Sequence, residues 1–260
     1  MSNKTNNSVS ITNARRYVEY VLEKRKIDLP PIPAACIISY MTGLADLAKA
    51  SFPHQIIDLG CTTHAPIHLF YPEHANPFAI AQGHHGAPMA AVMLEELIAL
   101  GFERFLSLGA AGHPCNSQGT KLAVGDIVLP KMALIFEGTS LHYRAEGGIS
   151  TPALALYDQT SSILNAKGIR FTPGTVATTD ALYRETPEFI QTITERHAIA
   201  LDMELSALFS VAAFHGKEIA GLLYISDIIS TEGSWQLGLM GQFPGRLEHE
   251  LFAVAQAFCE

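Results

Sequence analysis

The stretch LDMELSAL, residues 201–208, and the later tripeptide ISD, residues 225–227, decide the predicted fold. Each places an acidic residue, Asp202 or Asp227, where a run of apolar, strand-forming residues ends. A helix-like segment, residues 204–215, lies between the two runs. Strand, helix and strand in this order predict a βαβ unit. Because ligands collect at the carboxyl ends of strands in open α/β sheets, we expect both carboxylates to face one crevice.

The rest of the chain continues this alternation of strands and helices. Apolar periodicity and Gly or Pro boundaries predict strands near residues 34–39, 55–59, 66–70, 77–82, 105–108, 125–130 and 174–178, and helices near 14–22, 88–100, 152–167, 187–196 and 245–258. The pattern predicts a single α/β domain, residues 12–260, with a central mixed, twisted β-sheet flanked by helices. The Ser-, Asn- and Thr-rich residues 1–11 are expected to form a disordered tail.

Composition restricts the class of function. The chain has 260 residues, of which 48% are hydrophobic, so it can bury the core of one domain. Its formal net charge of −8 argues against nucleic acid or an anionic membrane as a partner, because both would repel it. Charged residues make up only 16% of the chain, which indicates surface hidden in subunit contacts. We therefore expect a homo-oligomer: a dimer, a trimer or a hexamer.

Neither the cysteines nor the N-terminus indicates export. Cys36, Cys61, Cys115 and Cys259 lack the spacing of a zinc or redox motif and read as reduced thiols. The polar residues 1–13 lack the apolar core of a signal peptide, and no apolar run is long enough to span a membrane. We expect a cytoplasmic protein.

The two stretches quoted first also carry a family resemblance. Together with VAAFHG, residues 211–216, and YISD, residues 224–227, they resemble the core of the purine nucleoside phosphorylase and uridine phosphorylase superfamily. In that family a Met-Glu pair opens a helix of small residues, and a strand ends in Ser-Asp in the purine branch. The resemblance extends over about residues 30–257, and it implies cleavage of an N-glycosidic bond.

This resemblance assigns roles to individual residues. It implies that Glu204 accepts hydrogen bonds from the ribose 2′ and 3′ hydroxyls, with Met203 against the sugar face. It implies that Asp227 is catalytic, because a carboxyl group beside the purine N7 can share or donate a proton as the base leaves. The residues expected around the base are Leu182, Asp202, Asp227 and Gly112.

Both principal carboxylates also have a structural interpretation. A carboxylate at position 204 can stabilise the start of a helix through the helix dipole, and Asp227 can cap the following turn. The resemblance favours the binding role in each case.

The segment TTDALY, residues 178–183, indicates which base is preferred. It resembles a family segment in which a Phe stacks on the base, and Leu182 keeps an apolar wall there but lacks the stacking face. In the uridine branch, Gln and Arg that read the uracil carbonyls follow, whereas this chain has Thr186 and Glu188. We therefore predict a purine rather than a pyrimidine nucleoside.

Two glycine-rich segments are candidates for a phosphate site. GHHGAP, residues 83–88, precedes a predicted helix, and SLGAAG, residues 107–112, is expected to form a turn after a strand. Glycines allow close approach of the backbone, and a helix start offers free N–H groups to an anion. The resemblance implies phosphate contacts from Ser107, Gly109, Ala110 and Gly86.

The phosphate site nevertheless departs from the family pattern. Ser107 and Ala110 stand where the family has an Arg and a hydroxyl residue, and residues 39–46 lack the Arg that follows the first strand in the family. Bidentate bonds from arginine are therefore missing. We predict weak or unusual phosphate use unless a cation comes from Arg144, Arg184, Arg246 or a neighbouring subunit.

Histidines provide no firm site. His84 and His85 predict no metal centre, because sequence neighbours rarely chelate one ion. The stretch FEGTSLHY, residues 136–143, resembles a uridine phosphorylase segment, and its His142 either contacts a substrate in a neighbouring subunit or bonds within its own loop. No metal or organic cofactor is expected.

These features predict a nucleoside phosphorylase with an atypical phosphate site. It would cleave a purine nucleoside with phosphate as co-substrate, giving free base and ribose 1-phosphate. Two alternatives stay open. One is a nucleosidase that uses water, although residues 39–47 lack the glutamate of the hydrolytic branch. The other is a nucleoside-binding protein without catalysis.

Overall fold

The computed structural model describes residues 10–59, 66–115, 121–143, 148–238 and 245–260. The α-helices are α1 (Ala14–Arg25), α2 (Leu44–Ser51), α3 (Ala87–Leu100), α4 (Leu154–Ala166), α5 (Pro187–Glu195), α6 (Leu205–Phe214) and α7 (Gly245–Cys259). The strands are β1 (Ala35–Ser39), β2 (His54–Ile57), β3 (Ile67–Phe70), β4 (Phe78–Gln82), β5 (Arg104–Cys115), β6 (Ile127–Phe136), β7 (Ile149–Ser150), β8 (Phe171–Thr179), β9 (Ala198–Asp202), β10 (Glu218–Ser230) and β11 (Trp235–Leu237). Short 3-10 helices η1 (Thr139–His142) and η2 (Leu182–Arg184) connect them. Residues 1–9 of the expected disordered tail lie outside the described residues.

One mixed β-sheet organises the molecule. Its strand order is β11-β10-β6-β8-β9-β5-β1-β4-β3-β2, with β7 beside β6. β10 also pairs with β5, so β10, β6, β8, β9 and β5 close into a ring, while β1, β4, β3 and β2 extend from it as an open sheet. The predicted single domain with a mixed sheet flanked by helices is confirmed.

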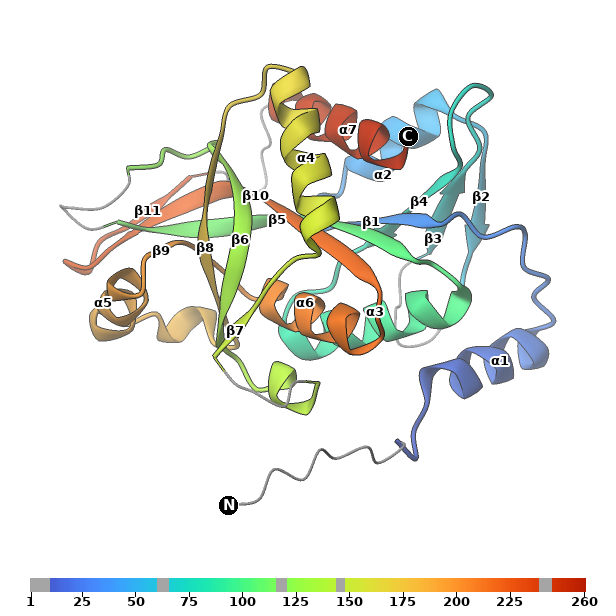
Figure 1. The fold of residues 1–260 in the computed structure, drawn as a ribbon, viewed down its shortest axis with the longest axis horizontal. Helices are drawn as coiled ribbons and strands as arrows, with labels where there is room; N and C mark the ends of the chain where they lie inside the picture. Colours follow the sequence, from blue (N-terminus) through green and yellow to red (C-terminus); the bar gives the residue numbers. More distant parts are fainter. Residues whose placement is uncertain (1–9, 60–65, 116–120, 144–147, 239–244) are drawn as a thin grey trace.

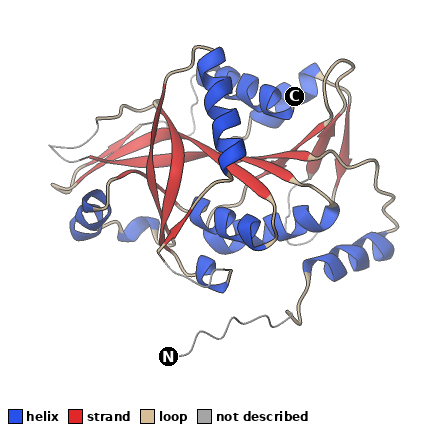
Figure 2. Cartoon of the chain, in the orientation of Figure 1, coloured by secondary structure: helices blue, strands red, loops and turns tan. Residues whose placement is uncertain are grey.

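Helices cover both faces of this sheet, as Figures 1 and 2 show. α3 and α6 lie on one face and contact each other, with α1 packed against α3. α4 and α7 lie on the opposite face, where α2 also contacts α7. In the part of the chain that is described, no helix has both the length and the apolar character needed to cross a membrane.

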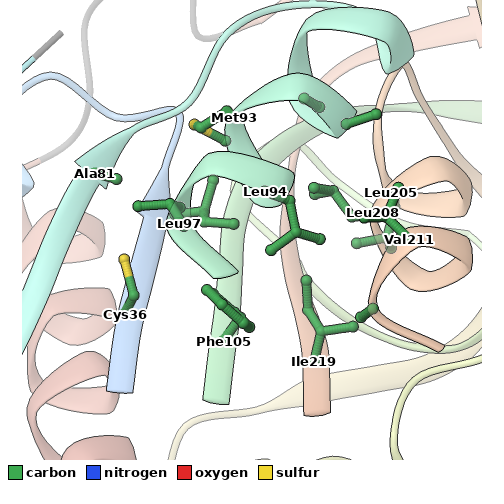
Figure 3. Close-up of a cluster of buried hydrophobic side chains, with 14 of the residues drawn as sticks. Cys36, Ala81, Met93, Leu94, Leu97, Phe105, Leu205, Leu208, Val211 and Ile219 are labelled. Carbon is green, nitrogen blue, oxygen red and sulfur yellow. The ribbon is translucent and has the colours of Figure 1, made fainter. Parts of the chain in front are cut away.

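The pleat of β1 divides its side chains between two apolar cores. Cys36 and Ile38 belong to the core under α3 and α6, whereas Ala35 and Ile37 belong to the core under α7. Such alternation follows from the two-residue period of a strand. Figure 3 shows the first core, where α3, α6 and strands contribute Cys36, Ala81, Met93, Leu94, Leu97, Phe105, Leu205, Leu208, Val211 and Ile219. Burial of each large apolar side chain contributes about 1.5–3 kcal/mol.

The predicted βαβ unit is wrong in its strand pairing. β9 and β10 are not neighbours: β5 lies between them, antiparallel to β9 and parallel to β10. The two acidic segments still flank one position, because Gly112 of β5 pairs with Leu201 on one side and with Asp227 on the other. Chain order alone does not reveal a third strand inserted between two consecutive ones.

The predicted turn at residues 107–112 is also wrong, because the whole segment is part of β5. Its small residues allow close packing within the sheet. A Cβ atom added to Gly112 would lie 2.8 Å from Ile229 Cδ1, and one added to Gly109 would lie 3.4 Å from Leu223 Cδ2. Glycine here provides space for neighbouring side chains rather than a change of direction. α2, β7 and β11 were not predicted from the sequence.

Candidate functional site

The candidate site lies at an open stretch along one edge of β5. On this edge, β1 pairs with β5 as far as Leu108, and β9 pairs with it only at Gly112. Residues 109–111 between them pair with β10 on the opposite edge, and within the described ranges no strand pairs with them on the first edge. We call residues 109–111 the open edge. The turn at residues 83–86 and the start of α6 meet beside it.

Glu204 is fixed beside this open edge at the cap position of α6. Its side chain is buried, with 8% of the residue exposed, and Oε1 accepts a hydrogen bond of 2.6 Å from the N–H of Gly86. Gly86 has a φ of 93°, which L side chains rarely adopt, so a glycine at this position lets the turn direct its N–H at the carboxylate. The exposed His85 places Nδ1 4.0 Å from the same oxygen. Burial, and secondarily Asp202, raises the pKa of Glu204.

Asp202 supports Glu204 from the end of β9. Thr178 Oγ1 donates to its Oδ1 over 2.6 Å, and the N–H groups of Glu204 and Leu205 donate to its Oδ2 over 3.2 and 2.7 Å. These bonds satisfy free N–H groups at the start of α6 and fix the position of Glu204. Burial raises the pKa of Asp202 in spite of them. The structure thus gives Asp202 a capping role, and its contact with a base stays a prediction.

Asp227 lies across β5 from this carboxylate pair. A β-bulge at Ser226 shifts the pairing between β10 and β5 and turns Asp227 toward Gly112, where an added Cβ atom would lie 3.3 Å from Oδ2. Asp227 Oδ1 accepts from Ser226 Oγ over 2.5 Å, and Oδ2 accepts from Trp235 Nε1 over 2.7 Å. The side chain is therefore oriented by two neighbouring donors.

A cavity of about 220 Å³ is lined in part by Trp235, which donates to Asp227, and it adds a residue that was not predicted from the sequence. Leu182, Trp235 and Glu185 are among the residues that line it. Burial, and secondarily the charge of Asp227, raises the pKa of Glu185 to about 7. Glu185 follows η2 in an irregular segment with no periodic pattern. The sequence offered one indication that Glu185 belongs to the site: it follows Leu182, a predicted base-binding residue, by three positions.

The predicted phosphate residues are spread over different environments. Ser107 is buried in the middle of β5, paired with Ile38 on one side and Gly221 on the other. Gly109 and Ala110 belong to the open edge, whereas the N–H of Gly86 is already donated to Glu204. A phosphate contact from any of them stays a prediction.

The remaining candidates lie toward the surface. Arg184 is exposed on η2, and Arg246 on α7 donates from Nε to Glu250 Oε1 over 2.8 Å. His142 is exposed on η1, and Met203 is partly buried directly before Glu204. Arg144 lies outside the described residues. The proposed roles of Met203 at the sugar and of His142 in a neighbouring subunit stay predictions.

Comparison with known proteins identifies the family. The model of the phosphorylase superfamily matches residues 36–259. The chain is 30% identical over 134 residues to a guanosine phosphorylase of Halorubrum lacusprofundi, a match that covers 50% of this chain and 53% of the relative. It is 26% identical over 156 residues to a uridine phosphorylase of Thermococcus kodakarensis, with 54% of each protein covered. The chain thus spans about half the length of these curated relatives.

Solved structures with the same fold cover nearly the whole chain. An AMP nucleosidase from Bacteroides thetaiotaomicron superposes with a TM-score of 0.72 at 22% identity and covers 94% of this chain and 96% of its own. A purine nucleoside phosphorylase from Toxoplasma gondii, in complex with immucillin-H, superposes with a TM-score of 0.73 at 17% identity and covers 88% of this chain and 90% of its own. Because the family model matches most of the chain and the fold agrees with it, this chain belongs to the phosphorylase superfamily.

Proposed function

We propose that this protein cleaves the N-glycosidic bond of a purine nucleoside. The observation that carries the proposal is the buried Glu204 carboxylate, held by the N–H of Gly86 beside the open edge of β5. A carboxylate in a fixed position can accept hydrogen bonds from two vicinal ribose hydroxyls. Such bonds stabilise the ionised form, so ribose binding would lower the raised pKa of Glu204 and release a proton.

The base would lie on the Asp227 side, next to the cavity. A glycosidic bond breaks more easily when the departing base is protonated, and a carboxylic acid near the purine N7 can supply that proton. Two carboxyl groups are available there, and the raised pKa of Glu185 keeps that acid protonated below about pH 7. Asp227, predicted from the sequence to be catalytic, keeps that role beside the base in this proposal, and we add Glu185 as a second proton donor, with Leu182 as the apolar wall of the base site.

The acceptor of the ribosyl group distinguishes two candidate reactions. Phosphorolysis to ribose 1-phosphate is the reaction predicted from the sequence, and the similarity to a guanosine phosphorylase and a uridine phosphorylase supports it. Hydrolysis is the second candidate. A specific observation favours it: the side chain of Tyr40 occupies space between Gly83 and Gly109, in the two segments that were expected to hold phosphate.

The test is incubation with inosine, guanosine, adenosine and uridine, with and without phosphate, followed by quantification of free base and sugar product. We expect free base from at least one purine nucleoside and little from uridine. Efficient cleavage of uridine with inert purine nucleosides would overturn the base assignment. Tight nucleoside binding without any turnover would instead support a binding protein.

Variants of two buried glutamates provide the matched control. Glu204→Gln keeps the shape of the side chain but removes its charge, and it should abolish most of the cleavage. Glu96→Gln changes another buried glutamate, on α3. Glu96 lies nine residues after Ala87, the first residue of α3, which is about 13.5 Å along the helix axis. The second variant should keep wild-type activity, and equal loss in both would refute a specific role of Glu204.

A further inference from the structure

Tyr40 is the first residue after β1, and backbone hydrogen bonds fix its place at the open edge. Its N–H donates to Leu108 O over 2.9 Å, and the N–H of Gly83 donates to Ser39 O over 2.7 Å. These bonds extend the parallel pairing of β1 with β5 and β4 just past its last residue. Tyr40 therefore lies next to Leu108, the last residue of β5 that is paired with β1, and directly before the open edge.

The Tyr40 ring fills the space between two glycines. A Cβ atom on Gly83 would lie 2.7 Å from three carbon atoms of the ring, and one on Gly109 would lie 3.5 Å from Cδ2. The ring of His85 has its centroid 6.2 Å from that of Tyr40. Positions 83 and 109 belong to the two segments that were expected to bind phosphate. The aromatic ring thus stands where a phosphate between these segments would have to lie.

The Tyr40 hydroxyl is the second observation, independent of the ring. It is shielded from solvent and makes no hydrogen bond to any part of the described chain. Buried polar groups normally have a partner, so a buried hydroxyl without one marks a place for a ligand or a water molecule. Burial, followed by the charges of Glu204 and Asp202, raises the pKa of Tyr40, which keeps the hydroxyl a neutral donor.

The charges around this hydroxyl favour a neutral acceptor over an anion. Glu204 and Asp202 are the charged groups that act on it. No Lys or Arg of the described residues forms an ion pair or a hydrogen bond with either carboxylate. The exposed imidazole of His85 lies 4.0 Å from Glu204 Oε1. A phosphate dianion would be repelled by carboxylates without a compensating cation, whereas water would not.

We propose that Tyr40 selects the acceptor of the reaction: its ring excludes phosphate from the space between Gly83 and Gly109, and its hydroxyl binds the attacking water. This inference rests on the proposed cleavage of a nucleoside. In the reaction, the water oxygen bonds to ribose C1′ while the bond from C1′ to the base nitrogen breaks. The electron pair of that bond leaves with the base, one water proton ends on the base, and the other remains on the new ribose hydroxyl.

The identity of the sugar product tests the choice of acceptor. Wild-type protein is incubated with inosine or guanosine at millimolar phosphate, and free ribose and ribose 1-phosphate are quantified from the earliest time points. We expect free ribose and no ribose 1-phosphate. Formation of ribose 1-phosphate by the wild type, saturating at micromolar phosphate, would overturn the proposal.

Two substitutions of Tyr40 separate the ring from the hydroxyl. Tyr40→Phe keeps the ring and should lower kcat at least about 10-fold, with KM for the nucleoside within about 2-fold. Tyr40→Ala opens the space and should give measurable ribose 1-phosphate. Tyr71→Phe is the matched control, because Tyr71 is also partly buried against the core but its hydroxyl bonds Pro31 O, away from the site. Unchanged kcat in Tyr40→Phe would refute the role of the hydroxyl.

Direct binding of inorganic phosphate keeps the inference testable if no nucleoside is cleaved. Calorimetric titration should detect no binding to wild type or to Tyr40→Phe, and binding to Tyr40→Ala with a Kd on the order of 1–10 mM. Binding to the wild type, or to none of the three proteins, would contradict exclusion by the ring. Absence of cleavage together with the expected phosphate binding would refute the proposed function and leave the role of the ring supported. Thermal melting of each variant verifies that it is folded.

Discussion

The proposed sugar side of the candidate site, around Glu204 and Asp202, and its proposed base side, around Asp227 and the cavity, differ in how completely one chain builds them. On the sugar side, Glu204 and Asp202 are 8% and 6% exposed, and backbone N–H groups hold both carboxylates. On the base side, Leu182, Tyr183 and Trp235 are 40%, 85% and 51% exposed. The sugar side is therefore preorganised within the sheet, whereas large apolar side chains on the base side still face solvent. This contrast agrees with the expected homo-oligomer, which stays a prediction.

The largest expected effect is the loss of sugar binding in Glu204→Gln. Hydrogen bonds to a charged group contribute about 1.5–3 kcal/mol each, so the nucleoside affinity should fall by about that amount per lost bond. Calorimetric titration with inosine, in the absence of phosphate, measures the change. Unchanged affinity would remove Glu204 from the site and break the contrast between the two sides.

A second effect concerns the pH dependence of stability. Burial raises the pKa values of Glu204 and Asp202 in the folded state, so the folded protein binds more protons than the unfolded chain between their unfolded and folded pKa values. Their contribution to the free energy of unfolding is present below about pH 4 and is lost as the pH rises through the folded values. We expect the free energy of unfolding to fall by an amount on the order of 2 kcal/mol from pH 5 to pH 8.

Urea denaturation at several pH values tests this effect. Glu204→Gln should flatten the curve and be more stable than the wild type at pH 8, because it removes a buried charge. If the free energy of unfolding rises from pH 5 to pH 8, the pKa values of Glu204 and Asp202 are not raised in the folded protein.

An effect of similar size on stability, with a smaller one on nucleoside binding, is expected from a change at Gly86, whose N–H holds the Glu204 carboxylate. Gly86→Ala places a side chain at a φ of 93° and should destabilise the protein by about 1–3 kcal/mol. Gly101→Ala, at a φ of 111° at the other end of α3, introduces comparable strain away from the site. We expect both variants to lose stability in urea denaturation, but only Gly86→Ala to raise KM for the nucleoside. An equal change of KM in both would contradict the specific role of the Gly86 N–H.

The smallest effect is expected on the base side. Trp235→Phe removes the N–H that donates to Asp227 Oδ2 but keeps an aromatic ring in the cavity wall. Because Trp235 is half exposed, water can replace this hydrogen bond. The binding free energy of a free purine base should therefore weaken by only about 0.5–1.5 kcal/mol. Competition binding with free hypoxanthine measures it. A loss as large as that of Glu204→Gln would show that the base side is as preorganised as the sugar side.

Sequence patterns predicted much of this fold correctly, where the signal is local. Helix α3 ends at Leu100, as predicted, and Gly101 after it adopts a left-handed conformation. Strand β1 also lies within the predicted range 34–39. Glu204 was recognised because a Met-Glu pair at a helix start is a short motif. Such features depend on residues close together in the chain, so the sequence contains them directly.

Features that depend on distant residues were missed. Residues 107–112 read as a turn, because small residues and glycine are common in turns, but β10 and β1 provide strand partners for them. Glu185 acquires its raised pKa from burial and from Asp227, a residue far along the chain. Neither pairing nor burial is encoded in local periodicity.

By itself, the sequence determined the mixed α/β class, the single domain and the position of the Met-Glu motif at a helix start, because these follow from hydrophobic periodicity and short motifs; the role of this motif in sugar binding stays a prediction. Only the tertiary structure decided which strands are neighbours, and it placed β5 between β9 and β10. It also decided the environment of Tyr40, an unremarkable residue in the sequence, by burying its hydroxyl beside Glu204 without a partner. The physical reason is that hydrogen-bond satisfaction, desolvation and close packing depend on contacts between segments far apart in the chain.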